Sequence, residues 1–180
     1  MLFKTDKVIN GYMPTYYRLA AELGPNADVC EVGVQDGYGL EMWRTLFPEG
    51  RVVGVDIDPE ARWPEGCERI VCDQASLELP EKLDGSFDLI VDDASHIGSL
   101  TAITFRNLWP LVKPGRYYVI EDWGVGFKSF KGFDSSMLRL AESMLDRFEP
   151  GNADPFVDSI TYSTGLMVIK RTDLPFIYPA

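Results

Sequence analysis

Short apolar runs along the chain alternate with longer segments in which apolar residues recur at helical spacing. The apolar runs have the length of strands and are almost continuously hydrophobic, which is typical of strands covered on both faces. They occupy residues 28–32, 51–56, 68–72, 87–92 and 116–122. The alternation of such strands with amphipathic helices predicts an α/β fold with a mainly parallel sheet and helices on both faces.

The longer segments predict helices, and the C-terminal part departs from the alternation. The predicted helices cover residues 12–23, 40–47, 97–112 and 135–148. Residues 156–171 look like two strands joined through the sequence STG, which indicates a β-hairpin and an antiparallel strand near one edge of the sheet. Residues 123–136 carry Trp123, Phe127 and Phe130 and are interpreted either as a flap over an acceptor or as an ordinary exposed loop.

Composition indicates one globular domain. The chain has 180 residues, 46% of them hydrophobic, which is enough for one buried core, so we expect a single domain over residues 1–180. A formal net charge of −11 argues against a nucleic-acid partner. Cys30 and Cys72 lie in apolar runs and form no CxxC pair, which favours a reducing, cytoplasmic setting. No apolar run approaches membrane-spanning length, so we expect no membrane partner.

A glycine-rich sequence follows the first predicted strand. In EVGVQDGYG, Glu31 ends the strand, and Gly33, Gly37 and Gly39 follow it. Glycines at a strand-to-helix turn let a ligand approach the backbone and the N–H groups of the next helix. The spacing differs from the G-x-G-x-x-G of dinucleotide-binding proteins. A glycine at such a place can also serve only as a turn, so the loop alone leaves both interpretations open.

Acidic residues end the next two predicted strands. Asp56 is placed to bind both hydroxyls of a ribose, and Asp73 is placed to accept a hydrogen bond from an adenine amino group. Ligands of open α/β sheets bind beyond the carboxyl ends of the strands, where all of these residues fall. The sequence therefore predicts a cofactor that carries a nucleoside. The predicted contacts are Glu31, Gly33, Val34, Gln35, Gly37, Gly39, Asp56, Ile57, Asp73 and Gln74.

The glycine-rich loop, the sequence VDID and the C-terminal hairpin together resemble the class I S-adenosylmethionine-dependent methyltransferases. The resemblance implies a Rossmann-like seven-stranded sheet of order 3-2-1-4-5-7-6 with strand 7 antiparallel. It also implies S-adenosylmethionine as the cofactor, with Gly33 and Gly37 beside its methionine part, Asp56 at the ribose and Asp73 near the adenine. This cofactor has no pyrophosphate, which fits a loop without a basic residue.

Two further strands end in paired acids. VDDASH carries Asp92, Asp93 and the single histidine, His96, and VIEDW carries Glu121 and Asp122. Carboxylates that meet at adjacent strand ends raise one another's pKa unless a cation is bound. Oxygen ligands without cysteine indicate a hard divalent cation such as Mg²⁺ rather than structural zinc. The alternatives are that the first pair caps the following helix and that the second pair is solvated.

DDASH and IEDW resemble one branch of these enzymes, the metal-dependent sugar O-methyltransferases of macrolide and related natural-product pathways. The N-terminal sequences TDK and GYMPTYY resemble the same branch. The resemblance implies that Asp93, Glu121 and Asp122 are ligands of Mg²⁺. It further implies that His96 is the general base and that Asp92 lies on the cofactor side.

The predicted reaction moves a methyl group from S-adenosylmethionine to a hydroxyl of a small glycosidic acceptor, as in the biosynthesis of antibiotics and other natural products. The cation stabilises the developing alkoxide, and His96 removes the proton, because imidazole exchanges protons near neutral pH. An NAD-dependent oxidoreductase, a catalytically silent S-adenosylmethionine-binding protein and a hydroxylase-like relative stay open as alternatives. The small size and the aromatic N-terminal segment also suggest a homodimer.

Overall fold

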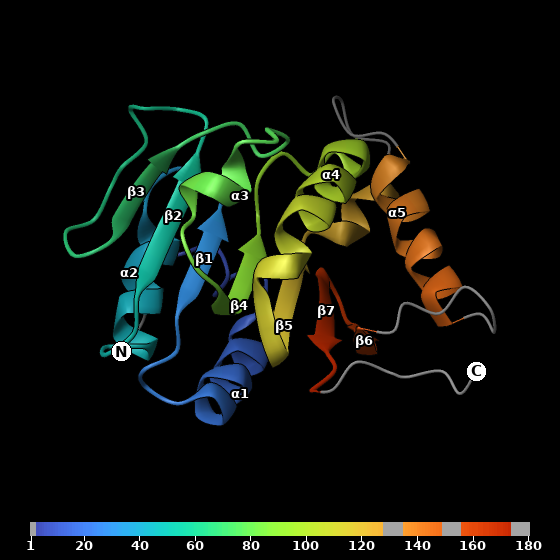
Figure 1. The fold of residues 1–180 in the computed structure, drawn as a ribbon, viewed down its shortest axis with the longest axis horizontal. Helices are drawn as coiled ribbons and strands as arrows, with labels where there is room; N and C mark the ends of the chain where they lie inside the picture. The colour runs from blue at the N-terminus through green and yellow to red at the C-terminus, as the bar shows by residue number, and fades with distance from the viewer. Residues whose placement is uncertain (1–2, 128–134, 149–155, 174–180) are drawn as a thin grey trace.

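The computed structural model describes residues 3–127, 135–148 and 156–173 and shows a seven-stranded sheet (Figure 1). The strands are β1 Val29–Val32, β2 Val52–Asp56, β3 Glu68–Val71, β4 Phe87–Asp92, β5 Val112–Glu121, β6 Val157–Tyr162 and β7 Leu166–Arg171. Their order across the sheet is β3-β2-β1-β4-β5-β7-β6. Strands β1 to β5 pair in parallel, whereas β7 pairs antiparallel with both β5 and β6. The predicted fold class and strand order are confirmed.

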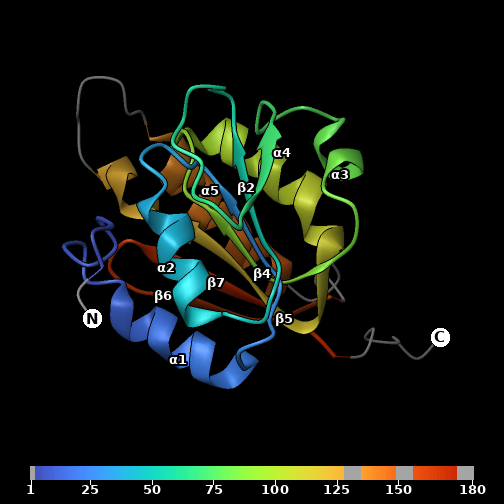
Figure 2. The same ribbon diagram turned by 90° about the vertical axis from the view of Figure 1, so that its left-hand side faces the viewer.

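Helices cover both faces of the sheet (Figures 1 and 2). The helices are α1 Met13–Leu23, α2 Tyr38–Leu46, α3 Leu79–Lys82, α4 Gly98–Leu108 and α5 Ser136–Leu145. Apolar side chains of α1 and α2 form one hydrophobic cluster with one face of the strands. Those of α3, α4 and α5 form a second cluster with the other face. Because successive strand residues point to opposite faces, each central strand contributes side chains to both clusters.

The structure differs from the sequence-based prediction in three local features. The helix predicted over 97–112 ends at Leu108 and continues as a 3₁₀ turn over Trp109–Leu111, because Pro110 cannot continue the α-helical hydrogen bonding. Strand β5 therefore begins at Val112, before the predicted start at residue 116. The four-residue helix α3 was not predicted, since one turn is too short to show helical periodicity.

The order of the strands brings the predicted site residues together. The carboxyl ends of β1, β2, β4 and β5 lie along one edge of the sheet, and the loops that follow them carry the glycines and the acids. Gly33 allows a close approach here, because a side chain at this residue would collide with the backbone carbonyl of Asp93. In the part of the chain that the structure describes, no helix is both long and apolar enough to cross a bilayer.

Candidate active site

A cavity of about 660 Å³ opens at the carboxyl ends of β1, β2 and β4, beside the N-terminal segment, residues 3–12. Its volume lies within the range of small-molecule sites. Most residues predicted to contact the cofactor line it, namely Glu31, Gly33, Val34, Gln35, Gly39, Asp56, Ile57, Asp73 and Gln74. Asp93 and His96 line the same cavity, which therefore joins the two halves of the predicted site. The predicted site residues outside its lining, all of them described, are Gly37, Asp92, Glu121 and Asp122.

Asp56 shapes the glycine-rich loop. One carboxylate oxygen accepts hydrogen bonds from the backbone N–H groups of Val34 (2.7 Å) and Gln35 (3.0 Å). The other accepts from the backbone N–H of Asp58 at 2.9 Å. Partial burial by itself raises the pKa of Asp56, but these donors outweigh it and hold the pKa below its usual value. Asp56 is therefore an ionised acceptor at the cavity wall, as a residue that binds a ribose must be.

The glycines of the loop have separate structural roles. Gly39 makes room for Glu31, because a side chain at residue 39 would collide with the Glu31 carboxylate. Gly37 adopts φ +70° where α2 begins, and a side chain there would meet the backbone carbonyl of Arg62. Gly37 therefore packs behind the loop rather than facing the cavity, whereas the resemblance implied a place beside the methionine part of the cofactor.

The wall after β3 carries Asp73 and Gln74. The Asp73 carboxylate accepts a hydrogen bond from the backbone N–H of Ala75 at 2.8 Å. The side-chain amide of Gln74 donates to Thr104 at 2.9 Å and accepts from the backbone N–H of Ser95 at 3.2 Å. Gln74 thus fixes the loop that leads from β4 to His96, in addition to lining the cavity.

Asp92 lies on the opposite face of the sheet from the α1 and α2 layer. Asp92 and Ile90 are two residues apart in β4, so their side chains point to the same face of the sheet. Ile90 belongs to the hydrophobic cluster formed with α3, α4 and α5. The Tyr118 hydroxyl donates to the Asp92 carboxylate at 3.3 Å, and burial raises the pKa of Asp92 to about 7. This orientation is the physical reason why Asp92 is absent from the cavity lining, where the resemblance implied a cofactor contact.

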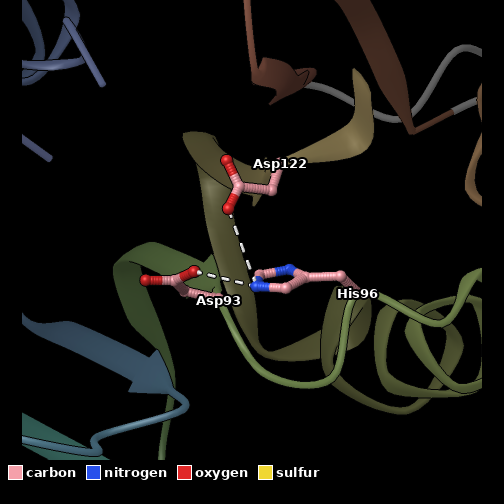
Figure 3. Close-up of side chains that lie close together, drawn as sticks. All are labelled: Asp93, His96 and Asp122. Carbon is pink, nitrogen blue, oxygen red and sulfur yellow. Dashed lines mark ion pairs between the residues drawn. The ribbon is translucent and has the colours of Figure 1, made fainter. Parts of the chain in front are cut away.

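Asp93, His96 and Asp122 form what we call the outer acid group (Figure 3). His96 Nε2 lies 3.8 Å from Oδ1 of Asp93 and 3.7 Å from Oδ2 of Asp122. One candidate ligand atom from each residue lies within 4.8 Å of the others, so the group is compact enough to surround one cation. Figure 3 shows both acids turning one oxygen towards the same nitrogen of the ring.

Two residues of the outer acid group have unusual backbone conformations. His96 has φ 54° and Asp122 has φ 55°, both in the left-handed region. A non-glycine residue in this region costs about 1–3 kcal/mol, and such strain concentrates at functional sites. These conformations accompany the approach of the His96 ring to Asp93 and Asp122.

A second cluster, which we call the inner acid group, surrounds the ammonium of Lys7. Lys7 Nζ lies 3.0 Å from Oε1 of Glu31, 3.0 Å from Oε1 of Glu121 and 2.5 Å from Oδ2 of Asp93. The Lys7 side chain is only 2% exposed. Burial by itself lowers the pKa of Lys7, but the three carboxylates raise it well above its ordinary value, so the lysine is charged. Burial raises the pKa of Glu31 and Glu121, and Lys7 opposes that rise.

Two tyrosines, Tyr16 in α1 and Tyr12 just before it, bind the acids. The hydroxyl of Tyr16, which is fully buried, donates a hydrogen bond to Glu121, and the hydroxyl of Tyr12 donates one to Asp122. From the sequence, Tyr16 was predicted only as part of the helix over residues 12–23, and neither Lys7 nor Tyr12 was assigned a role. Their one signal was the resemblance of TDK and GYMPTYY to the N-terminal segment of the sugar O-methyltransferases.

The aromatic segment after β5 is described in part. A 3₁₀ helix covers Trp123–Phe127, and the Trp123 indole N–H donates to the backbone carbonyl of Ser163 at 2.9 Å. Phe127 is exposed. Residues 128–134, which include Phe130, lie outside the described residues, so the proposed flap stays a prediction.

The sheet order and the antiparallel β7 define the fold of the class I methyltransferases. No protein-family model matches the chain. The chain is 39% identical to 8-demethyl-8-(2-methoxy-alpha-L-rhamnosyl)-tetracenomycin-C 3'-O-methyltransferase of Streptomyces olivaceus, over 81% of this chain and 44% of that protein. It is 31% identical to demethylmacrocin O-methyltransferase of Streptomyces fradiae, over 75% of this chain and 40% of that protein.

Solved structures give the same result. MycE methyltransferase from the mycinamycin biosynthetic pathway, in complex with Mg, SAH and mycinamycin VI, matches with a TM-score of 0.78 and 26% identity, over 89% of this chain and 49% of MycE. The chain is therefore a homologue of the sugar O-methyltransferases of natural-product pathways, which confirms the resemblance seen in its motifs. It spans less than half the length of these relatives.

Proposed function

We propose that the protein is a Mg²⁺-dependent O-methyltransferase that moves a methyl group from S-adenosylmethionine to a sugar hydroxyl of a natural product. One observation carries this proposal. The cavity that fits a nucleoside cofactor is lined by Asp93 and His96, which also form part of a group compact enough to hold a cation. Methyl donor, cation and base would therefore meet at one place.

The donor set of the cavity fits S-adenosylmethionine. Asp56 offers a carboxylate to the ribose hydroxyls, and Asp73 offers one towards the adenine. Glu31 is 2% exposed and lines the cavity, and its Oε2 has no hydrogen-bond partner among the described residues. A buried carboxylate oxygen without a donor is costly, and the ammonium of the methionine part would supply one.

The oxygen atoms of the outer acid group fit a hard divalent cation. Asp93 and Asp122 would bind it through the oxygens that face His96, and Glu121 is the third ligand that the resemblance implies. Glu121 Oε1 already accepts a hydrogen bond from Tyr16 and faces Lys7, so this oxygen is bound within the chain. A bound Mg²⁺ would stabilise negative charge developing on the acceptor oxygen.

His96 performs the proton transfer in this proposal. Its Nε2 removes the hydroxyl proton while the acceptor oxygen forms a bond to the methyl carbon. The bond from that carbon to sulfur breaks, and the sulfonium becomes a neutral thioether. The proton would then reside on His96, whose Nε2 lies within 4 Å of the carboxylates of Asp93 and Asp122.

Chelation and calorimetry test the proposal. We expect EDTA to abolish methyl transfer to a glycosylated macrolide or tetracenomycin acceptor, and Mg²⁺ or Mn²⁺ to restore it. Titration calorimetry should detect binding of S-adenosylmethionine and S-adenosylhomocysteine but not of NAD⁺. Activity that is indifferent to the chelator would exclude the cation. Binding of NAD⁺ instead of S-adenosylmethionine would favour an oxidoreductase, and cofactor binding without turnover on any acceptor would favour a catalytically silent protein.

A further inference from the structure

We propose that Lys7 and Tyr12 of the N-terminal segment are positioning residues for the cation site. Lys7 binds one oxygen of Asp93, and Tyr12 binds one oxygen of Asp122. The other oxygen of each acid faces His96. This inference rests on the proposed function, because it concerns how the proposed cation ligands are oriented. Neither residue was assigned a role from the sequence, and the mechanism above uses neither.

The two oxygens of Asp93 face different partners. Oδ2 lies 2.5 Å from Lys7 Nζ, whereas Oδ1 lies 3.8 Å from His96 Nε2. The contact to Lys7 is a charge-assisted hydrogen bond, which is among the stronger interactions that fix a carboxylate. Rotation of the Asp93 carboxylate would break this contact, so the carboxylate offers only Oδ1 to the outer acid group.

Asp122 repeats this arrangement with a different partner. Its Oδ1 accepts a hydrogen bond from the Tyr12 hydroxyl, whereas its Oδ2 lies 3.7 Å from His96 Nε2. Tyr12 is only 4% exposed, so water competes little for this hydrogen bond. In each acid, therefore, one oxygen, which we call the inner oxygen, binds the N-terminal segment. The other, the outer oxygen, faces Nε2 of His96.

The segment that carries both residues is itself held firmly. The Tyr12 backbone N–H donates to the Lys7 carbonyl at 2.9 Å, which joins the two residues in one turn. Lys7 is tied to the ends of β1 and β5 through Glu31 and Glu121. Gly165 in the β6–β7 turn makes room for the Tyr12 ring, because a side chain there would collide with its hydroxyl. The sheet and the hairpin thus fix the positions of both donors.

Groups that hydrogen-bond to metal ligands orient those ligands, and their loss typically lowers metal affinity about 10- to 100-fold. Tyr12→Phe tests the inference with the smallest change, since it removes one hydroxyl and no charge. Tyr117→Phe is the matched control, because the Tyr117 hydroxyl donates to Glu22 at 2.6 Å, away from the site. Both variants lose one hydrogen bond from a tyrosine to a carboxylate.

The experiment measures Mn²⁺ binding by electron paramagnetic resonance in the presence of S-adenosylhomocysteine. We expect Tyr12→Phe to bind Mn²⁺ about 10- to 100-fold more weakly than the wild type, with unchanged affinity for S-adenosylhomocysteine. Tyr117→Phe should match the wild type. Raising Mn²⁺ to saturation should restore most of the kcat of Tyr12→Phe, which would not happen if Tyr12 only supported the fold.

The two possible failures are distinguishable. If Tyr12→Phe binds Mn²⁺ as tightly as the wild type does, or if Tyr117→Phe weakens binding equally, the positioning role is excluded and the proposed function stands. If the wild type itself binds no Mn²⁺, the proposed function fails, and this inference fails with it.

Discussion

The inner and outer acid groups are built from the same kind of side chain but differ in their source of positive charge. In the inner group, the chain supplies its own cation, the buried ammonium of Lys7, to Glu31 and Glu121. In the outer group, the outer oxygens of Asp93 and Asp122 both face His96. Asp93 belongs to both groups, one oxygen to each. The difference indicates that the inner group stabilises the fold, whereas the outer group is available to an external cation.

The largest effect that we expect comes from removing His96. His96→Ala should lower kcat by about 10²- to 10⁴-fold, because general-base catalysis contributes about this much. The affinities for S-adenosylhomocysteine and for Mn²⁺ should stay within about threefold of the wild type, since a base contributes little to either ground-state complex. Steady-state kinetics and the two binding titrations check these values.

The same variant distinguishes a base from a metal ligand. If His96→Ala loses Mn²⁺ affinity in parallel with kcat, the histidine ligates the cation and the outer group is a mixed nitrogen and oxygen site. If the variant keeps most of its activity, the base is another group.

Removal of Lys7 tests the inner group. Lys7→Met should lower the free energy of unfolding by about 3–5 kcal/mol, because breaking a buried ion pair leaves uncompensated buried charge. Urea denaturation followed by circular dichroism measures this change. Lys82→Met is the matched control, since the exposed Lys82 contacts only the exposed Glu78, at 3.5 Å, among the ion pairs of the described residues.

We expect Lys82→Met to change the free energy of unfolding by no more than about 0.5 kcal/mol. Equal effects of the two substitutions would mean that Lys7 is not a structural cation, and the contrast between the inner and outer groups would be lost.

A smaller effect is expected at Asp56, which lines the cofactor cavity and belongs to neither acid group. Asp56→Asn should weaken S-adenosylhomocysteine binding about 10- to 100-fold, because hydrogen bonds to a charged group are worth about 1.5–3 kcal/mol. Asp58→Asn serves as the control, since the Asp58 side chain accepts a hydrogen bond from the backbone N–H of Glu60, at 2.8 Å, and does not line the cavity formed by the described residues. Calorimetry on both variants checks the difference, and equal affinities would remove Asp56 from the cofactor site.

Much of the cofactor side could be predicted from the sequence, because its parts are local. Each part lies at the end of a strand or just after it: the glycine-rich loop after β1, Asp56 at the end of β2 and Asp73 after β3. The order of the strands therefore brings them to one cavity. The orientation of side chains was harder to foresee. Asp92 and Asp93 are neighbours in the sequence, yet they point to opposite faces of the sheet, and only Asp93 reaches the cavity.

The inner acid group could not be predicted, because its residues come from distant parts of the chain. Lys7 lies 86 residues from Asp93, and no periodicity or spacing relates the two. Repulsion among the acids indicated a cation, and a metal ion was predicted to neutralise all of them. The structure shows that a lysine performs part of this neutralisation. Long-range ion pairs of this kind depend on how the N-terminal segment folds back onto the sheet.

The most direct test of the cation site is a crystal structure with Mn²⁺ and S-adenosylhomocysteine, using the anomalous scattering of manganese. We expect one anomalous peak within bonding distance of the outer oxygens of Asp93 and Asp122, with Lys7 still bound to the inner oxygen of Asp93. A map without a peak between these two acids, or with the manganese in the place of the Lys7 ammonium, would contradict this expectation.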